Sequence, residues 1–270
     1  MKQRIAFIGG GNMARAMIGG LRQAGADPAR ITVGEPQAAA RAALSGEFGV
    51  QVHADNTTAV RGADAVIVAV KPQDAAQVLQ PLRADLQSAR PLLLSICAGV
   101  RIESLARWTG LAAVVRAMPN RPALVGAGVT GACAGAGVDA GRRALAEHIL
   151  RSCGQVVWVG AEAQLDAVTA LSGSGPAYFF FLAEQLAAAG VRLGLDPAAA
   201  RTLAAETLYG AGQMAHVDAD LEAQRQAVTS KGGTTEAALA VLMAGPVGQS
   251  IEAAVVAAAH RSAEMAQTYT

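Results

Sequence analysis

The sequence contains few residues of the kinds that most often form crosslinks, bind metals or transfer protons. Its 270 residues include three cysteines, four histidines and three lysines. Cysteines this few and this scattered do not build a disulfide framework or a zinc-binding motif, so we expect small buried thiols in a reducing cytoplasm. No histidine stands at a metal-binding spacing from a partner, and we expect surface or helix-capping roles for them and no metal site.

Charged residues are also scarce, at 16%, and the net charge is only +1. This balance argues against binding to nucleic acid or to an acidic membrane surface. The apolar start, Ile5–Ile8, is too short for a signal peptide and runs into glycines, so none is expected. The later apolar run from Ala177 to Leu195 is interrupted by Glu184 and Arg192, which predicts a buried helix and not a membrane span. With 52% hydrophobic residues, the chain is expected to hide apolar surface between subunits.

What the sequence does contain, over its first 160 residues, is an alternation of short apolar runs with alanine-rich stretches. The run Ala65–Val70 is apolar throughout, which is typical of a parallel strand buried on both faces. Strands and helices in alternation predict an α/β fold whose sheet is doubly wound. We expect strands at Ile5–Ile8, Ile31–Val33, Ala65–Val70, Leu92–Ile96, Ala113–Val115 and Val156–Val159, and helices at Asn12–Ala24 and Gln37–Leu44.

Beyond Gly160 the strand-like runs stop, and alanine, leucine, glutamate and glutamine dominate. We therefore predict an α/β domain over residues 1–160 and an all-helical domain over residues 161–270. The helix that follows Pro176 is apolar on every side, so we expect partners to cover it on every side. Helix breaks are predicted at Gly173–Pro176, Gly194–Pro197, Gly232–Gly233 and Gly245–Pro246.

The stretch Gly9–Ala14 directly follows the first predicted strand and opens the first predicted helix. It has the G-x-G-x-x-A form of a dinucleotide-binding loop, and its strand–loop–helix setting indicates a Rossmann-type domain. Gly9 and Gly11 let the backbone approach a pyrophosphate closely. The free N–H groups at the helix start, around Asn12 and Met13, attract its negative charge. We therefore predict that this loop binds NADH or NADPH.

Glu35 follows the second predicted strand, where an acidic residue usually binds the ribose hydroxyls of NAD and repels the extra phosphate of NADP. This position argues for NADH. A carboxylate that points into solvent would carry no such information, and Arg41 lies on the next predicted helix. The sequence therefore leaves the choice between NADPH and NADH open.

Three later strands end in residues that suit the same ligand, because the carboxyl ends of parallel strands line the ligand crevice. Lys71 would meet a phosphate or a ribose, and the small residues after the next strand would let the nicotinamide ring lie against backbone. Asn120 would bond the carboxamide or the substrate. Alternatively, each ending is a strand terminus with a solvated side chain. The cofactor contacts predicted here are Val70, Lys71, Pro72, Cys97, Ala98 and Gly99.

The helical part offers no well-placed histidine or lysine as a general acid, which favours chemistry that needs only a weak proton donor. Hydride addition to a C=N bond is such chemistry. The stretch Thr229–Leu239 is either a linker or an anion site. Thr234 or Thr235 is expected to cap a helix that starts near Glu236. The free N–H groups from Gly233 onward would then converge on a carboxylate.

Several stretches follow one another in a fixed order along nearly the whole chain: Phe7–Ala14, Ala69–Gln73, Ser95–Val100, Arg116–Asn120, Ser172–Tyr178 and, most specific of all, Val228–Thr235. Together they resemble the motifs of the pyrroline-5-carboxylate reductases. The resemblance implies that NAD(P)H reduces the cyclic imine 1-pyrroline-5-carboxylate to L-proline, the last step of proline biosynthesis. It also implies that the helical domain interlocks with a twofold mate, as a homodimer or a ring of dimers, with the active site near that interface.

The resemblance also implies roles for single residues. Ser230, Gly233, Thr234 and Thr235 match the residues that hold the substrate carboxylate. Thr235 matches the hydroxyl placed near the ring nitrogen and is the expected catalytic residue. Asp218 lies near the place of an acidic residue of the family, at a loose spacing.

Three positions depart from the family pattern. Lys231 stands where proline is commonest, and it adds a positive charge beside the expected carboxylate. Arg121 stands where threonine is commoner, and Glu35 is not the residue expected for NADP. The first two leave the reaction intact, whereas the third puts the cofactor preference in doubt.

Two other functions compete with this interpretation. β-Hydroxyacid dehydrogenases share the glycine loop, but they use a lysine on the long helix after the Rossmann domain, and the stretch Pro176–Leu182 has none. A non-catalytic NADP sensor or an oligomeric scaffold would explain the first domain. It would give no reason for the Gly-Gly-Thr-Thr sequence near the end of the chain.

Overall fold

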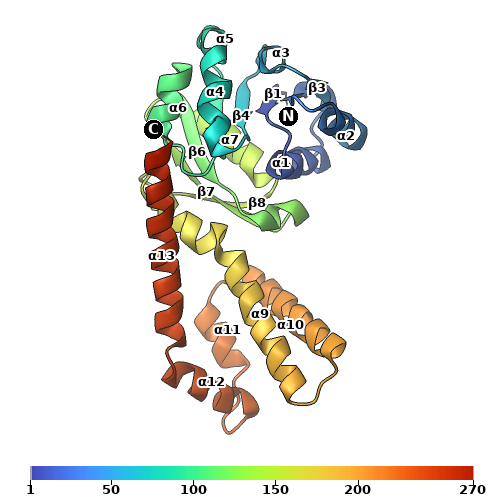
Figure 1. The fold of residues 1–270 in the computed structure, drawn as a ribbon, viewed down its shortest axis with the longest axis vertical. Coiled ribbons are helices and arrows are strands. Elements are labelled where there is room, and N and C mark those ends of the chain that lie inside the picture. The colour runs from blue at the N-terminus through green and yellow to red at the C-terminus, as the bar shows by residue number, and fades with distance from the viewer. Residues whose placement is uncertain (1, 270) are drawn as a thin grey trace. The chain divides into compact units, whose positions relative to one another are not determined.

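The computed structural model describes residues 2–269, which form two compact units (Figure 1). The first unit contains the residues up to Gly173 and those from Ala258 onward, and the second contains Ser174–Ala257. The division predicted at residue 160 follows the end of the last strand, Trp158, whereas the packing divides the chain further on. As a statement about domains, the division at residue 160 stays a prediction.

In the described part of the chain the first unit is built on one eight-stranded sheet with the order β3-β2-β1-β4-β5-β6-β7-β8. The strands from β1 to β6 are parallel, β7 runs antiparallel to β6, and β8 runs parallel to β7. This arrangement confirms the predicted Rossmann-type α/β fold. The strands are β1 Ile5–Ile8, β2 Ile31–Gly34, β3 Gln51–His53, β4 Ala65–Val68, β5 Leu92–Ser95, β6 Val114–Met118, β7 Gly128–Ala134 and β8 Gly154–Trp158.

Helices cover both faces of this sheet. Along β1, Ile5 and Phe7 join one apolar cluster, and Ala6 and Ile8 join the other, as the alternation of a strand requires. Phe7 is fully buried, and burial of a side chain of this size stabilises the fold by about 1.5–3 kcal/mol. On the first face lie α1 Asn12–Gln23, α2 Ala38–Phe48 and α7 Ala140–Arg151, and on the second α3 Asn56–Val60, α4 Ala75–Leu79, α5 Arg83–Ala89 and α6 Ile102–Thr109.

Short helical turns connect these elements. The turns are η1 Pro28–Arg30, η2 Pro72–Asp74, η3 Gln80–Leu82 and η4 Arg121–Val125, and the unit continues through α8 Gln164–Val168 and a π-helical turn, η5 Thr169–Gly173.

The three cysteines are free and buried, as predicted from their number and spacing.

The second unit contains helices only. Asp196 caps the start of α10 by accepting hydrogen bonds from the N–H groups of Ala198 and Ala199, and Asp220 caps α11 in the same way through Ala223. All four predicted helix breaks are confirmed. The helices are α9 Gly175–Arg192, α10 Pro197–Val217, α11 Leu221–Ala227, α12 Thr234–Ala244 and the first half of α13 Val247–Thr268, whose second half belongs to the first unit.

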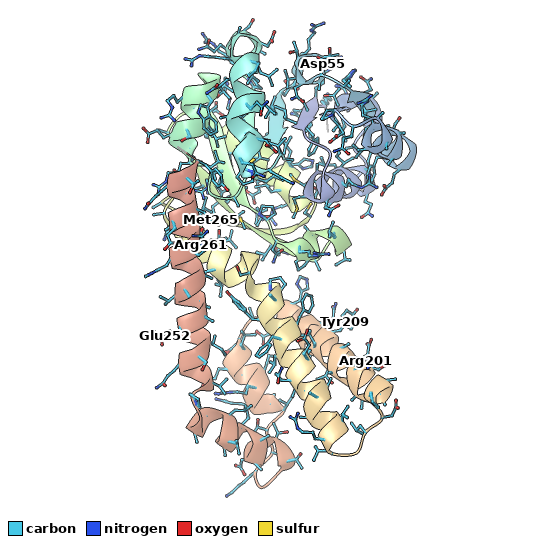
Figure 2. The ribbon with its side chains drawn as sticks, in the orientation of Figure 1. Asp55, Arg201, Tyr209, Glu252, Arg261 and Met265 are labelled. Atoms are coloured by element: carbon cyan, nitrogen blue, oxygen red, sulfur yellow. The ribbon has the colours of Figure 1, made fainter. Side chains whose placement is uncertain are left out.

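Many large apolar side chains of the second unit are exposed to solvent. Phe179, Phe180 and Phe181 on α9 are 57–62% exposed, so in the single chain this helix is not buried as the sequence predicted. Tyr209 on α10, labelled in Figure 2, is also exposed. No single helix among residues 2–269 is long and apolar enough to cross a membrane, and only the bent pair of α12 and α13 passes that test jointly, by length and composition.

Candidate functional site

The glycine loop after β1 has the geometry that a bound dinucleotide requires. Gly9 adopts a φ of 95°, and its N–H donates to the carbonyl oxygen of Gly34 at 2.9 Å. A Cβ atom at Gly9 would lie 2.9 Å from the carbonyl oxygen of Ala69, and one at Gly10 would lie 2.5 Å from Leu44 Cδ1. A Cβ atom at Gly11 would meet nothing within 4 Å. The first two glycines are therefore needed for packing, and the third faces open space where a ligand can approach.

Helix α1 begins at this loop with unpaired backbone donors. Its first internal hydrogen bond joins Arg15 N to Gly11 O at 2.9 Å. Within the described residues, the N–H groups of Asn12, Met13 and Ala14 therefore have no acceptor. Together with the helix dipole they favour an anion at this point, as predicted.

The Glu35 carboxylate is held against the glycine loop and does not point into solvent. Its Oε2 accepts a hydrogen bond from Gly10 N at 3.1 Å, and its Oε1 accepts one from Gln37 N at 2.9 Å. Nearby, Arg41 donates to the carbonyl oxygens of Glu35 at 2.9 Å and of Pro36 at 2.6 Å. The carboxylate is thus fixed at the end of β2, beside the loop in which the pyrophosphate is expected.

The loops after β4 and β5 meet the glycine loop at the carboxyl edge of the sheet. A Cβ atom at Gly9 would lie 2.9 Å from Val70 Cγ1, so these two residues are in close contact. The Cys97 thiol donates to Val70 O at 3.2 Å and to Val68 O at 3.5 Å. Burial raises the pKa of this thiol to about 11, so it stays protonated and serves as a donor. Lys71 is exposed on the same edge.

Asn120 is already engaged inside the first unit. Its Oδ1 accepts a hydrogen bond from Val129 N at 3.0 Å, and its Nδ2 donates to Ser172 O at 3.1 Å. The residue is only 8% exposed. Asn120 therefore ties the end of β6 to β7 and to η5. The direct contact with substrate that the sequence suggested stays a prediction.

A charged pair that the sequence reasoning did not assign lies next to this region. Arg116 on β6 is almost fully buried and forms an ion pair with Glu162, with 2.9 Å between Nη1 and Oε1. The same Glu162 oxygen accepts a hydrogen bond from Ile102 N at 2.8 Å and so satisfies the first turn of α6. The signal that could have revealed the pair is an arginine inside an otherwise apolar strand, because a buried charge needs a partner.

In the second unit, the loop Ser230–Thr235 leads into α12. Gly232 adopts a φ of 73°, and a Cβ atom at Gly233 would lie 2.4 Å from Ser230 Oγ. The N–H of Gly233 donates to Ser230 O at 3.0 Å, and Glu236 Oε2 accepts a hydrogen bond from Gly232 N at 2.7 Å. The positive φ of Gly232 therefore favours glycine, as the sequence suggested, and Gly233 leaves room for the Ser230 side chain.

The prediction that Thr234 or Thr235 caps this helix is wrong. Gly233 is the N-cap residue, in extended conformation, and α12 begins at Thr234. Because Glu236 reaches back to the loop, neither threonine hydroxyl is needed for capping. The N–H groups of Thr234, Thr235 and Glu236 have no acceptor in the part of the chain that the structure describes. The predicted set of free donors is thus present, except for the N–H of Gly233.

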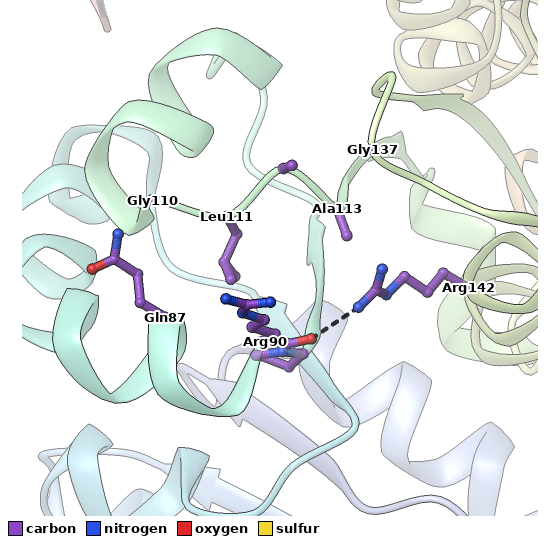
Figure 3. Close-up of a pocket in the computed structure, with 9 residues that line it drawn as sticks. Gln87, Arg90, Gly110, Leu111, Ala113, Gly137 and Arg142 are labelled. Atoms are coloured by element: carbon purple, nitrogen blue, oxygen red, sulfur yellow. Dashed lines mark hydrogen bonds between the residues drawn. The ribbon is translucent and has the colours of Figure 1, made fainter.

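A separate hollow of about 540 Å³ lies at the amino-terminal edge of β5 and β6, which is the edge opposite the glycine loop (Figure 3). Arg142 crosses it and donates to the carbonyl oxygen of Arg90 at 3.2 Å. None of the predicted site residues lines this hollow. Among residues 2–269, no group of three or more histidine, cysteine or acidic side chains could hold a metal ion.

Both parts of the chain match models of known protein families. Residues 162–265 match the family model of pyrroline-5-carboxylate reductase dimerisation, and residues 4–99 match that of the coenzyme F420-dependent NADP oxidoreductases. The pyrroline-5-carboxylate reductase of Pseudomonas aeruginosa is 45% identical over 98% of this chain and 97% of its own length. The chain belongs to the pyrroline-5-carboxylate reductase family.

Two solved structures agree with this assignment. A pyrroline-5-carboxylate reductase from Coxiella burnetii has a TM-score of 0.95 at 40% identity and covers 98% of this chain and 99% of its own. The Plasmodium falciparum pyrroline carboxylate reductase, solved with NADP bound, has a TM-score of 0.82 at 29% identity, with 98% of each chain covered. The resemblance found in the sequence is therefore confirmed, and with it an NAD(P)H-dependent oxidoreductase of the pyrroline-5-carboxylate reductase type.

Proposed function

We propose that this chain reduces the C=N bond of 1-pyrroline-5-carboxylate to give L-proline. The observation that carries the proposal is the presence, in one chain, of an open glycine loop with free donors and of the Ser230–Thr235 loop with a second set. Bound at the glycine loop Gly9–Ala14, NAD(P)H would supply a hydride to the imine carbon. When the nitrogen arrives protonated, the product amine forms without a strong acid, which agrees with a helical unit in which no lysine or histidine is assigned as a general acid.

In this proposal the Ser230–Thr235 loop binds the substrate carboxylate. The free N–H groups of Thr234 and Thr235 and the positive end of α12 attract the anion, and the Ser230 hydroxyl adds a donor. The Thr235 hydroxyl oxygen, which capping does not use, accepts a hydrogen bond from the protonated ring nitrogen and holds the imine carbon toward the nicotinamide. Lys231, on the same loop, adds positive charge for the incoming anion.

We further propose that NADH is preferred to NADPH. Glu35 is fixed by two backbone donors at the end of β2, where a carboxylate can accept hydrogen bonds from ribose hydroxyls. A 2′-phosphate placed there would meet this negative charge, while the Nη1 of the nearby Arg41 is turned to the backbone carbonyl oxygens of Glu35 and Pro36. The bound NADP of the Plasmodium falciparum structure belongs to that protein.

The exposed apolar face of the second unit supports a homodimer. The matched family model over residues 162–265 is that of a dimerisation domain, and monomeric proteins seldom leave so much apolar surface in water. Assembly into a ring of dimers, and a cytoplasmic location suggested by the free thiols, belong to the same proposal. The exposed residues on which it rests include Phe179, Phe180, Phe181, Leu186, Leu203, Tyr209, Val241, Met243 and Ile251.

A single assay tests the activity. The purified chain is mixed with NADH or NADPH, with and without 1-pyrroline-5-carboxylate, and absorbance at the nicotinamide band is followed while L-proline is quantified. We expect absorbance loss that depends on the imine, with one L-proline formed per NAD(P)H oxidised. Binding of NAD(P)H without any imine-dependent oxidation would instead favour the non-catalytic sensor.

A further inference from the structure

The last part of α13 packs into the first unit, although the helices just before it, α9 to α12, belong to the second. Ser262 and Ala266 are buried, at 7% and 1% exposure, and Tyr269 packs against the apolar cluster beneath α4 and α6. Ser262 and Ala266 are four residues apart and lie on the same side of α13, and Tyr269 follows directly after the helix ends at Thr268. Ser262 Oγ also donates to Asp166 Oδ1 at 2.7 Å, which fixes the helix to α8.

Ala266 and Tyr269 meet the backbone of the loop that follows β5. Gly99 has a φ of 78°, and a Cβ atom there would lie 3.2 Å from Tyr269 Cδ2 and 3.5 Å from Ala266 N. A side chain here would press on the Tyr269 ring, and the positive φ also favours glycine. The tyrosine ring therefore lies directly on the backbone of the loop.

The loop Cys97–Gly99 is thus held from two directions. The Cys97 thiol anchors one end to Val70 O, in the loop that contacts Gly9. Tyr269 and the backbone of Ala266 cover the other end. Only Ala98 lies between the two anchors, and this residue is partly exposed.

We propose that Tyr269 is a positioning residue that fixes the Cys97–Gly99 loop for the nicotinamide end of the cofactor. The proposal rests on the cofactor contacts expected at this loop. The ring does not touch the reacting atoms. It prevents the loop from moving away from the sheet edge, so that less conformational freedom is lost when the cofactor binds. Arg261 and Met265, labelled in Figure 2, lie on the same terminal part of α13.

The test compares cofactor binding in variants at the end of α13. Tyr269→Ala removes the ring, Tyr269→Phe keeps it, and Thr268→Ala changes an exposed neighbour. Dissociation constants for NADH and NADPH are measured by fluorescence without imine, together with both KM values and the Tm. We expect Tyr269→Ala to weaken cofactor binding by roughly 2- to 10-fold, the scale of one aromatic contact, with KM for the imine and Tm little changed. Tyr269→Phe and Thr268→Ala should bind cofactor like the unmodified chain.

A second pair of variants guards against a general loss of structure. Gly99→Ala adds a methyl group that meets the Tyr269 ring, in addition to the strain at its φ of 78°. In the Tyr269→Ala background the steric conflict is gone, so Gly99→Ala should weaken cofactor binding less than it does alone. Additive effects of the two substitutions, or unchanged cofactor binding in Tyr269→Ala, would overturn the proposal.

The experiments distinguish a failure of the proposed imine reduction from a failure of the proposed role of Tyr269. If the unmodified chain binds NAD(P)H but does not reduce the imine, the proposed function fails, while weaker binding in Tyr269→Ala still supports a positioning role. If the chain reduces the imine and Tyr269→Ala binds cofactor normally, the proposed function stands and the role of Tyr269 is excluded.

Discussion

The carboxylate of Glu236 accepts a hydrogen bond from the N–H of Gly232 at 2.7 Å, across the turn that opens α12. A glutamate at this position of a first turn commonly reaches back to an unpaired N–H group. Here its reach means that the threonines between the two residues are not used to cap the helix. The threonine hydroxyls of this loop are therefore available for the substrate binding proposed above.

Thr235→Ala should consequently lower kcat by tens to hundreds of fold. This is the scale of one lost transition-state hydrogen bond, for which about 4 kcal/mol is the upper end. The Tm should stay close to that of the unmodified chain, because the hydroxyl makes no capping bond. Steady-state kinetics with 1-pyrroline-5-carboxylate and thermal unfolding check both points. Thr235→Ser keeps a hydroxyl and is the matched control. Kinetics like those of the unmodified chain in Thr235→Ala would remove this residue from the active site.

Lys231→Met should raise KM for the imine by a few fold at low ionic strength and leave kcat nearly unchanged, because an exposed charge chiefly attracts the incoming anion. The difference between Lys231→Met and the unmodified chain should shrink as salt is added, since salt screens exposed charges. Kinetics at several salt concentrations measure this effect, and Lys2→Met serves as a control at an exposed lysine of the first unit. A salt-independent loss of kcat would point to a contact in the transition state instead.

Glu35→Gln should shift the cofactor preference toward NADPH. The amide keeps an oxygen that can accept the hydrogen bond from Gly10 N, but it removes the negative charge that opposes a 2′-phosphate. We expect KM for NADPH to fall by roughly tenfold, which corresponds to about 1.4 kcal/mol, and KM for NADH to change less. The measurement is the ratio of kcat/KM for the two cofactors. A chain that already strongly prefers NADPH before substitution would refute the role given to Glu35.

Asn120→Leu should destabilise the first unit by about 1–3 kcal/mol, because it leaves the buried N–H of Val129 and carbonyl oxygen of Ser172 without partners. Asn120→Asp keeps the acceptor for Val129 N and should be milder in denaturant unfolding. If Asn120 also contacts the substrate, Asn120→Asp should raise KM for the imine even at temperatures where the variant is fully folded. Unchanged stability in Asn120→Leu would contradict the structural role.

Phe181→Glu should weaken the homodimer, because it places a charge on an apolar face that is 62% exposed in the single chain. We expect light scattering after size-exclusion chromatography to report a shift toward monomer, and activity to fall with it. Glu222→Gln, on exposed α11, provides a control that should leave the assembly unchanged. A Phe181→Glu chain that stays dimeric would exclude this part of α9 from the interface.

The sequence predicted the elements whose signal is local. β1 and β4 were visible as apolar runs, and the helix breaks followed from glycine and proline. β3 was missed because Gln51–His53 is short and half polar, and β7 was missed because its glycines and alanines have low strand propensity. For the site, the glycine loop could be placed by its motif, and the glycines and threonines before α12 suggested an anion site to which the family resemblance then gave a substrate.

What the sequence could not predict depends on contacts between distant segments. The hydrogen bonds that fix the Glu35 carboxylate and engage Asn120, and the contact between Tyr269 and Gly99, join residues far apart along the chain. The cap of α12 was predicted wrongly because the first turn contains two threonines and a glutamate that can all accept a hydrogen bond from a free backbone N–H group. Local preference does not show which of these side chains does so. Whether α9 is covered depends on surfaces outside a single chain.

The position of Tyr269 also decides how the protein should be handled in the laboratory. A reporter attached at the exposed Thr268 would lie next to the ring that contacts Gly99, and under the proposed role of Tyr269 it should weaken cofactor binding. The same reporter at the exposed Lys2 would lie before the start of β1 at Ile5, on the edge of the sheet opposite the glycine loop. Apparent cofactor affinities should therefore differ between the two labelled proteins, and the label at Lys2 should give the native values.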